Sequence, residues 1–560
     1  MRAALSRKTW GMTERTTPGE RPGPGRTVLL RRGEIHSPAD PFATAMAVEG
    51  DRIAWVGSEA AADSLAPTAD EVIDLDGALV TPAFTDAHVH TTSAGLALTG
   101  LDLAGAAGLG EALALIREHA AARPAGEVLL GQGWDTTRWP EQRPPTRAEL
   151  DAAAGGRPLY LSRVDAHSAL ASTALMDRVP GLTRREGWRE DGPLTGDAHH
   201  AVRRAADAGI TPRQRAAAQR AALTRAAALG IGAVHECAGP EISSEEDLAA
   251  LLALAAAEPL PRVFGYWGGL VTDAKEAERV RERGAVGAAG DLFADGSLGS
   301  HTAHLREPYA DAPHHGTAHL TAAEVEAHVT ACTEAGLQAG FHAIGDAALD
   351  AVVAGFRAAA ARLGTGRVRA ARHRVEHAEL LTEETIAAFA DLALTASVQP
   401  AFDAAWGGAD GMYARRLGAE RARALNPFAA LLRAGVPLAF GSDAPVTPLD
   451  PWGTVRAAAF HRTPAHRVSV RAAFTAHTRG GWRALGRDDA GVLAPGAPAD
   501  YAVWRTGELL VQAPDDRIAR WSTDPRSGTP GLPDLSPGAP LPECLRTVAG
   551  GRVLHDLLTG

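Results

Sequence analysis

The chain has 560 residues, of which 45% are hydrophobic and 22% are charged, with a net charge of −11. This length predicts one large domain with insertions, or two to three domains, of a globular enzyme. The acidic balance argues against a nucleic-acid surface, and no apolar run approaches the roughly 20 residues that cross a bilayer. Three scattered cysteines do not make a disulfide framework, so we expect a cytoplasmic protein without membrane or nucleic-acid partners.

Both ends of the chain carry their own signals. Residues 1–26 are basic, rich in Pro and Gly, and lack the apolar core of a signal peptide, so we expect a disordered tail, or an over-long start with Met12 as the true first residue. Short apolar runs broken by Gly-Asp and Asp-Gly predict hairpins at 27–80, and residues 490–560 have a similar pattern of short apolar runs between turn residues. One small β-sandwich domain built from both chain ends is therefore expected.

The middle of the chain, residues 81–489, alternates short apolar strands with Ala-rich helices. Eight strands alternating with helices predict an α/β protein with a (β/α)₈ TIM barrel. A doubly wound sheet is the alternative, but no G-x-G-x-x-G follows a strand to support it. An α/β subdomain is expected at about 100–215, inserted after the first strand over the barrel mouth. The expected barrel strands are 83–90, 231–238, 262–267, 290–297, 338–346, 373–380, 394–400 and 437–445.

Histidine and aspartate residues recur where these strands end. His88 and His90 stand two residues apart, so both face the same side of a strand and point into the barrel mouth, where the active sites of this fold lie. His342, His377 and Asp443 occupy matching positions on other strands. Each of them alone is better explained as a helix cap or a polar strand end, but five in matching positions are hard to explain in that way. Imidazoles and carboxylates predict a divalent metal site, for Zn²⁺, Fe²⁺ or Mn²⁺.

Several motifs resemble the amidohydrolase superfamily, and most closely its YtcJ-like branch, the amidohydrolase 3 family, which includes N-substituted formamide deformylase. The similarity spans about residues 27–560 and implies a metal-dependent hydrolase made of a barrel and a small β-sandwich. The motifs that carry it are TPAFTDAHVH, GQGWDTTRW, PTRAELD, RVDAHSALASTAL, FADGSLGSHTAHLREPYAD, GFHAIGDAALD, RHRVEHAEL, SVQP and AFGSDAPVTPLDP.

The resemblance implies a role for each strand-end residue. His88, His90, His342 and Asp443 become metal ligands, and His377 becomes a ligand of a second metal or a hydrogen-bond donor to the reacting carbonyl. The metal, Zn²⁺ before Fe²⁺ or Mn²⁺, lowers the pKa of bound water toward about 7. Asp443 is then expected to take a proton from that water and pass it to the departing group.

The fourth strand departs from the pattern of this branch, which commonly has Lys-x-Phe there, with a carboxylated lysine that bridges two metals. Here the sequence is GDLFADG, with Asp291 at the position of that lysine. The only lysines in the sequence are Lys8, in the tail, and Lys275, in a charged segment expected to be a helix. Two hypotheses stay open: a mononuclear site, or a site to which Asp291 or another carboxylate contributes. We favour one metal ion, because the aspartate side chain is shorter than a carboxylated lysine.

Other residues are candidates for substrate contact. Asp295 is a lesser candidate for a metal or substrate contact, with a turn residue as the alternative. His235 is either a substrate contact or a paired strand-end histidine. Trp134 and His167 belong to the insertion, where the resemblance favours a lid that faces the substrate. His301 stands where this branch often has arginine, so its contact with substrate is the least supported of these.

We therefore expect a hydrolase that cleaves a non-peptide carbon–nitrogen bond in an amide, an N-formyl compound or a cyclic amide. Two alternatives stay open: an aminohydrolase (deaminase) on the same scaffold, and a catalytically weak barrel kept for binding or regulation. The expected partner is a small-molecule substrate, and the resemblance is compatible with a homo-oligomer. The substrate is not named by the sequence, because selectivity lies in the barrel loops and the insertion.

Overall fold

The computed structural model describes residues 25–136, 139–163, 168–512, 521–522 and 530–558. The tail expected at 1–26 lies outside these residues, apart from its last two. At the centre is a sheet of eight strands in the order β18-β17-β16-β15-β14-β13-β12-β7, paired in parallel. These strands are β7 (Phe84–Val89), β12 (Ile231–Ala238), β13 (Arg262–Trp267), β14 (Gly287–Ala288), β15 (Gln338–Ala343), β16 (Arg374–His377), β17 (Thr395–Val398) and β18 (Leu438–Phe440).

The first and last strands meet and close the barrel. The Asp443 backbone N–H donates to the His88 carbonyl at 2.8 Å, and the His90 N–H donates to the Ala444 carbonyl at 3.0 Å. These bonds lie at the carboxyl ends of β7 and β18, so they also bring the predicted ligands of the two strands together. The predicted (β/α)₈ barrel is confirmed.

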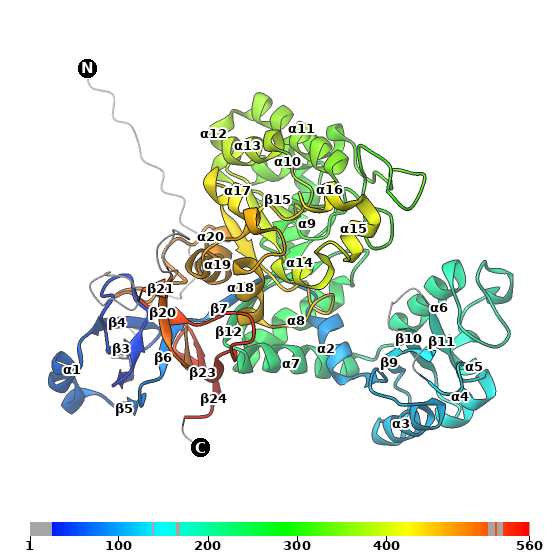
Figure 1. Ribbon diagram of the computed structural model, residues 1–560, viewed down its shortest axis with the longest axis horizontal. Coiled ribbons are helices and arrows are strands. Elements are labelled where there is room, and N and C mark those ends of the chain that lie inside the picture. The colour runs from blue at the N-terminus through cyan, green and yellow to red at the C-terminus, as the bar shows by residue number, and fades with distance from the viewer. Residues whose placement is uncertain (1–24, 137–138, 164–167, 513–520, 523–529, 559–560) are drawn as a thin grey trace.

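Helices surround the barrel (Figure 1). Several begin at side-chain caps: Thr211, Thr321 and Thr382 each accept from the backbone N–H three residues on and complete a capping box. Their Ala-rich inner faces pack on the strands, so the main core lies between the two layers. The helices are α7 (Pro212–Ala228), α8 (Glu245–Ala257), α9 (Ala274–Glu282), α10 (Ala322–Ala335), α11 (Asp346–Leu363), α12 (Thr365–Ala370), α13 (Glu383–Leu392), α14 (Pro400–Trp406), α15 (Met412–Leu417), α16 (Ala419–Ala422), α17 (Phe428–Arg433), α18 (Pro451–Ala459), α19 (Val470–His477) and α20 (Arg479–Ala484).

Two sheets beside the barrel form the predicted β-sandwich. One has the order β4-β3-β1-β5 and the other β2-β6-β19-β23-β24, so the second combines strands from both chain ends. Their buried faces share a core that includes Leu30, Val48, Val80, Val503 and Val548. The strands are β1 (Thr27–Arg31), β2 (Glu34–Ile35), β3 (Ala45–Glu49), β4 (Arg52–Gly57), β5 (Glu71–Asp74), β6 (Leu79–Pro82), β19 (Tyr501–Arg505), β23 (Glu543–Ala549) and β24 (Arg552–Asp556), with helix α1 (Glu59–Leu65) and a small sheet of β20 (Leu509–Gln512), β21 (Trp521–Ser522) and β22 (Leu532–Pro533).

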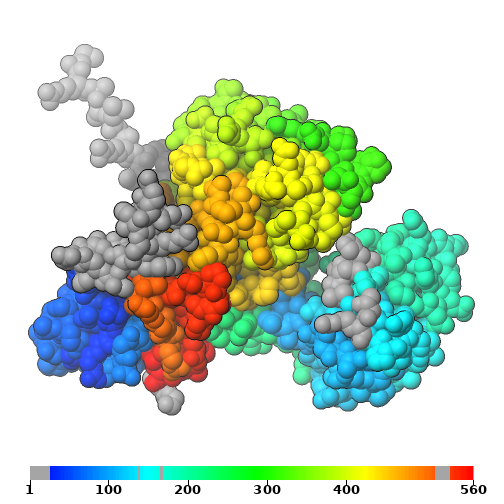
Figure 2. Space-filling model, in the orientation of Figure 1, coloured from blue at the N-terminus to red at the C-terminus, as the bar shows by residue number. Residues whose placement is uncertain are grey.

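An α/β insertion follows the first barrel strand and forms a lobe beside the barrel (Figures 1 and 2). Helix α2 (Thr91–Thr99) leads into it and packs against α7, which leads back. A Cβ at Gly95 would stand 1.8 Å from the Ala218 carbonyl oxygen, so the two helices cross this closely only with glycine there. The lobe contains β8 (Leu101–Asp102), α3 (Leu109–Ala122), β9 (Leu129–Trp134), α4 (Arg147–Ala153), β10 (Leu159–Arg163), β11 (Ala169–Ala171), α5 (Thr173–Met176) and α6 (Gly196–Ala208).

The fourth barrel strand differs from its prediction at 290–297. Strand β14 ends at Ala288, and Gly290 has a left-handed backbone with φ +83° that interrupts the extended run. The following segment still contacts β15, because the His342 N–H donates to the Leu292 carbonyl. Asp291 therefore lies in a loop after a short strand. The predicted strand at 290–297, which would have contained both Asp291 and Asp295, is therefore not formed with those bounds.

None of the described helices is long and apolar enough to span a membrane.

A buried histidine beneath the fourth strand makes the fold sensitive to acid. His328 of α10 is fully buried, accepts from the Val271 N–H at 2.9 Å and donates to the Ala288 carbonyl at 3.0 Å. Burial lowers its pKa from 6.5 to about 4. The folded protein thus keeps this ring neutral while the unfolded chain protonates it, so its contribution is present above pH 6.5 and is lost as the pH falls toward 4.

We expect His328→Asn to be less stable than the wild type at pH 7.5, with a difference that shrinks by up to about 3 kcal/mol toward pH 4.5. Urea titrations of both proteins at several pH values measure this difference. A difference that stays constant with pH would show that His328 does not titrate between its folded and unfolded states.

Candidate metal centre

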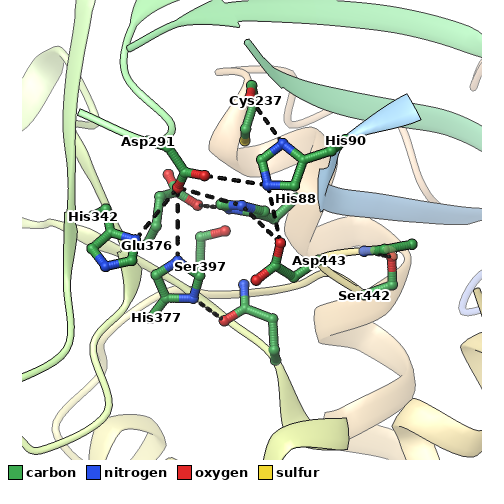
Figure 3. A network of polar contacts seen from close by, with 12 residues as sticks. His88, His90, Cys237, Asp291, His342, Glu376, His377, Ser397, Ser442 and Asp443 are labelled. Carbon is green, nitrogen blue, oxygen red and sulfur yellow. Dashed lines mark hydrogen bonds and ion pairs between the residues drawn. The ribbon is translucent and has the colours of Figure 1, made fainter. Parts of the chain in front are cut away.

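Six buried side chains converge at the carboxyl end of the barrel (Figure 3). They come from five strands or from the residues that directly follow them. Three sites are the end of β7, the next-to-last residue of β15 and the end of β16, and the other two are the loops that follow β14 and β18. None has more than 8% of its surface exposed. The six residues are His88, His90, Asp291, His342, His377 and Asp443, which are the ligand candidates named by the sequence.

Asp291 lies in the middle of this cluster. Its Oδ1 is 3.6 Å from His88 Nε2, 3.5 Å from His342 Nδ1 and 3.7 Å from His377 Nε2, and its Oδ2 is 3.2 Å from His90 Nε2. Asp291 therefore reaches the histidines although its side chain is shorter than a carboxylated lysine. Because its loop leaves the strand early, the backbone itself supplies the reach that a longer side chain supplies elsewhere.

Asp443 closes the cluster on the other side of the two β7 histidines. Its Oδ1 is 3.1 Å from His90 Nε2 and 3.6 Å from His88 Nε2. Burial opposes ionisation, but the His88 and His90 imidazoles outweigh it and hold the pKa of Asp443 below its usual range. The carboxylate is thus ionised at neutral pH.

Four atoms that face the centre of the cluster are buried and have no hydrogen-bond partner among the described residues: His88 Nε2, Asp291 Oδ1, His342 Nδ1 and Asp443 Oδ1. Buried polar atoms are nearly always paired, so a group of unpaired atoms facing one space indicates a ligand. Sets of three ligand atoms within 4.8 Å of one another are His88, His90 and Asp291; Asp291, His342 and His377; and His88, His377 and Asp443. Imidazole and carboxylate donors at this spacing fit a divalent transition metal.

The other ring nitrogen of each histidine is bonded to an oxygen. A carbonyl or carboxylate oxygen can only accept, so that nitrogen donates, and the nitrogen facing the cluster is the one left to bind a metal. The pairs are His88 Nδ1 with Glu376 Oε2 at 2.9 Å, His90 Nδ1 with the Cys237 carbonyl at 3.1 Å, His342 Nε2 with the Gly296 carbonyl at 3.1 Å, and His377 Nδ1 with Gln399 Oε1 at 2.8 Å.

A buried ion pair supports His88 from below. Arg374 and Glu376 are both fully buried and share two hydrogen bonds. Burial alone would raise the pKa of Glu376, but the Arg374 guanidinium lowers it to about 2, so the carboxylate stays ionised. Arg374 also donates to the Ala87 carbonyl and contacts His235 Nδ1 at 3.0 Å. His235 therefore lies behind the ligands, paired with arginine and fully buried, and not at the mouth.

Two of the candidate ligands, His377 and Asp443, have a strained left-handed backbone that sets the direction of their side chains. Regular alternation along β16 would turn His377 away from the side that Glu376 faces. Instead His377 has φ +68° and Ala378 φ +46°, and Asp443 has φ +55° after β18. Left-handed backbone at such residues costs on the order of 1–3 kcal/mol and is typical of functional sites. Here it directs both side chains into the cluster.

Two predicted contact residues lie outside the cluster. Asp295 is fully buried and accepts from the backbone N–H groups of His304, Ile344 and Gly345. It holds together the loops behind His342 and does not face the mouth. The side chain of His301 pairs with an exposed aspartate, Asp311, at 2.9 Å, so its ring is already engaged.

The candidate Trp134 of the insertion does not face the cluster. Trp134 is 2% exposed, packs in the core of the lobe and donates from Nε1 to the Leu161 carbonyl at 3.0 Å. It is a core residue, and the expectation of a lid role for it was wrong. His167, the other lid candidate, lies outside the described residues.

Sequence reasoning missed the residues that hold the ligands. Glu376 directly precedes His377, and Gln399 lies in the SVQP motif, so both residues belong to motifs that the sequence analysis used. The missing information was the register between strands: Glu376 contacts a histidine from β7, and Gln399 follows β17 and contacts a histidine from β16.

The sequence matches the model of the amidohydrolase family over residues 71–555. The chain belongs to the amidohydrolase family. Among curated relatives, Protein LONG AFTER FAR-RED 3 of Arabidopsis thaliana is 29% identical over 500 residues, 83% of this chain and 84% of the relative. Putative amidohydrolase YtcJ of Bacillus subtilis is 24% identical over 466 residues, 77% of this chain and 85% of the relative.

N-substituted formamide deformylase of Arthrobacter pascens is 36% identical over 149 residues, which is 26% of this chain and 28% of the relative. These similarities confirm the YtcJ-like branch of the amidohydrolase family. Among solved structures, an uncharacterized metal-dependent hydrolase from Pyrococcus furiosus has 27% identity and a TM-score of 0.71, over 85% of this chain and 98% of that one. The family and this neighbour agree with a hydrolase that uses a divalent metal.

The acceptor of His377 provides a test of how the amidohydrolase site is held. We expect Gln399→Leu to lower metal affinity about 10- to 100-fold, because His377 then loses the oxygen that fixes its ring and tautomer. Gln399→Glu keeps an acceptor oxygen and serves as the matched control. Competition with a chromophoric chelator measures the affinity. Equal affinity in the Leu variant and the wild type would mean that Gln399 does not position the ring.

Proposed function

We propose that this amidohydrolase cleaves a carbon–nitrogen bond other than a peptide bond, in an amide, an N-formyl amine or a cyclic amide. The observation that carries the proposal is the cluster of four histidines and two aspartates at the barrel mouth, in which four buried atoms have no hydrogen-bond partner among the residues that the structure describes. The similarity to N-substituted formamide deformylase supports N-formyl amines as the first substrate class to test.

The ligand set supports a divalent ion, and we propose Zn²⁺, with Fe²⁺ or Mn²⁺ as alternatives. When bound, such an ion lowers the pKa of water toward neutrality and polarises a carbonyl oxygen. The chain itself supplies the oriented donors: one nitrogen of each histidine is bonded to an oxygen, so the other nitrogen is held facing the cluster. All these groups are buried, so their charges and dipoles act in a site from which bulk water is largely excluded.

Asp443 is proposed as the residue that moves the proton. Its Oδ1 faces the cluster without a hydrogen-bond partner among the described residues, and it belongs to a carboxylate held ionised at neutral pH. It can accept a proton from the attacking water and deliver it to the nitrogen that leaves, because a leaving amine must be protonated to depart. The same atom thus serves as base and then as acid.

His377 is proposed as a metal ligand and not as a donor to the substrate carbonyl. Its Nδ1 donates to Gln399 Oε1, so Nε2, which points at Asp291, is the nitrogen left to bind a metal. A ring that donates from Nδ1 to Gln399 and binds a metal through Nε2 has no N–H left for a substrate carbonyl.

We also propose a small-molecule substrate and a reducing, cytoplasmic setting. The three cysteines are buried free thiols, which supports that setting.

The test is product analysis with N-formyl and N-acyl amines on protein reconstituted with Zn²⁺. We expect an acid, such as formate, and an amine in equal amounts. Release of ammonia without an acid would overturn the proposal in favour of a deaminase on the same scaffold. No turnover of any amide, formamide or cyclic amide by protein with full metal content would favour a barrel kept for binding.

A further inference from the structure

All four histidines point at the Asp291 carboxylate. Its Oδ2 is 3.2 Å from His90 Nε2, and the β7 pair of His88 and His90 also contacts Asp443. Its Oδ1 is 3.6 Å from His88 Nε2, 3.5 Å from His342 Nδ1 and 3.7 Å from His377 Nε2. Figure 3 shows Asp291 between these groups. It is common to two of the ligand sets, one on each side.

One ion does not satisfy this arrangement. A tetrahedral ion takes four ligands, whereas six side chains face the space. Within the described part of the chain, His88 Nε2 on one side of Asp291 and His342 Nδ1 on the other have no hydrogen-bond partner. An ion on one side would leave buried polar atoms without a partner on the other, which is costly. Two ions that share the Asp291 carboxylate pair all of them.

A lysine cannot serve as the shared ligand. Lys275 is exposed on α9, outside the barrel, and no other lysine lies among the described residues. The close approach of the Asp291 loop is built into the chain: a Cβ at Gly268 would stand 2.7 Å from the Asp291 carbonyl carbon. The Asp291 loop therefore passes this close to residue 268 only because that residue is glycine and has no side chain.

We propose that Asp291 bridges two metal ions in place of a carboxylated lysine, so that the binuclear centre assembles without carbon dioxide. This reverses the preference for one ion drawn from the sequence. The proposal rests on the proposed metal-dependent hydrolase, but its test counts ions and needs no substrate. A lysine must react with carbon dioxide before it can bridge, whereas an aspartate carboxylate is already ionised.

The test uses the full chain, stripped of metal and reloaded with Mn²⁺ in buffer freed of carbon dioxide or supplied with bicarbonate. We expect about two ions per chain by elemental analysis in both buffers, and an exchange-coupled electron paramagnetic resonance spectrum, since a shared carboxylate holds the ions close. This measurement on the wild type needs no variant. One ion per chain, or a second ion that requires bicarbonate, would overturn the proposal.

Variants add a matched comparison. Asp291→Asn should lose at least one ion and the coupled spectrum. Asp500→Asn should keep both, because Asp500 is also a buried aspartate but pairs with Arg262 near the β-sandwich. An Asp291→Asn protein that keeps two coupled ions would overturn the bridge. Hydrolysis with one ion per chain would contradict the bridge and spare the proposed function; two coupled ions without hydrolysis of any substrate would do the reverse.

Discussion

Replacing Asp443 with Asn is expected to lower kcat/KM for an N-formyl amine by about 10²- to 10⁴-fold. Asparagine keeps the shape of the side chain, but its amide cannot take a proton from water and pass it to the leaving nitrogen. Since Asp443 Oδ1 also lies 3.1 Å from His90 Nε2, metal content must be measured on the same samples. Steady-state kinetics at matched metal content isolates the loss of proton transfer.

The pH profile gives a readout that a merely structural role would not change. In the wild type, activity should fall at low pH as Asp443 becomes protonated, and this acidic limb should be absent from the residual activity of Asp443→Asn. Asp500→Asn is the matched control, because Asp500 is also a buried aspartate but pairs with Arg262 near the β-sandwich. An Asp443→Asn enzyme with the kcat/KM of the Asp500→Asn enzyme would remove Asp443 from the mechanism.

Replacing Glu376 with Gln is expected to have the largest effect on stability. Arg374 and Glu376 are both fully buried, and removing one charge leaves the other without its partner, which costs about 3–5 kcal/mol. The free energy of unfolding measures the loss. A Glu376→Gln protein as stable as the wild type would mean that Arg374 finds another counter-charge.

A double variant separates stability from positioning. Arg374→Met combined with Glu376→Met leaves no buried charge, so most of the lost stability should return. Metal affinity should still be about 10- to 100-fold below that of the wild type, because His88 Nδ1 no longer has its acceptor at 2.9 Å. Recovery of both properties in the double variant would show that Glu376 serves the fold alone.

The barrel could be predicted because buried parallel strands appear as short apolar runs between helices. Strands β12 and β13 have the predicted bounds, at 231–238 and 262–267. The fourth strand could not be placed in this way. Its sequence GDLFADG alternates apolar and polar residues as a strand does, and the left-handed backbone of Gly290 cannot be predicted from the hydrophobic pattern.

The cluster at the strand ends could be predicted to a similar extent. Residue type and position were enough to select the histidines and Asp443, because parallel strands end at one face of a barrel. They were not enough for Glu376, whose partner lies on a strand 288 positions earlier in the chain. Trp134 shows a second limit of prediction from sequence. A tryptophan in a motif can fill a core or face a substrate, and its residue type alone does not distinguish the two.

The requirement for a divalent ion is the most direct test of the proposed hydrolase. Protein stripped by a chelator, and shown by elemental analysis to hold no metal, should not hydrolyse an N-formyl amine, and adding Zn²⁺ should restore hydrolysis. Zn²⁺ should not restore it in His88→Ala, which lacks a ligand on the β7 side. Full activity of the metal-free protein would contradict the proposal.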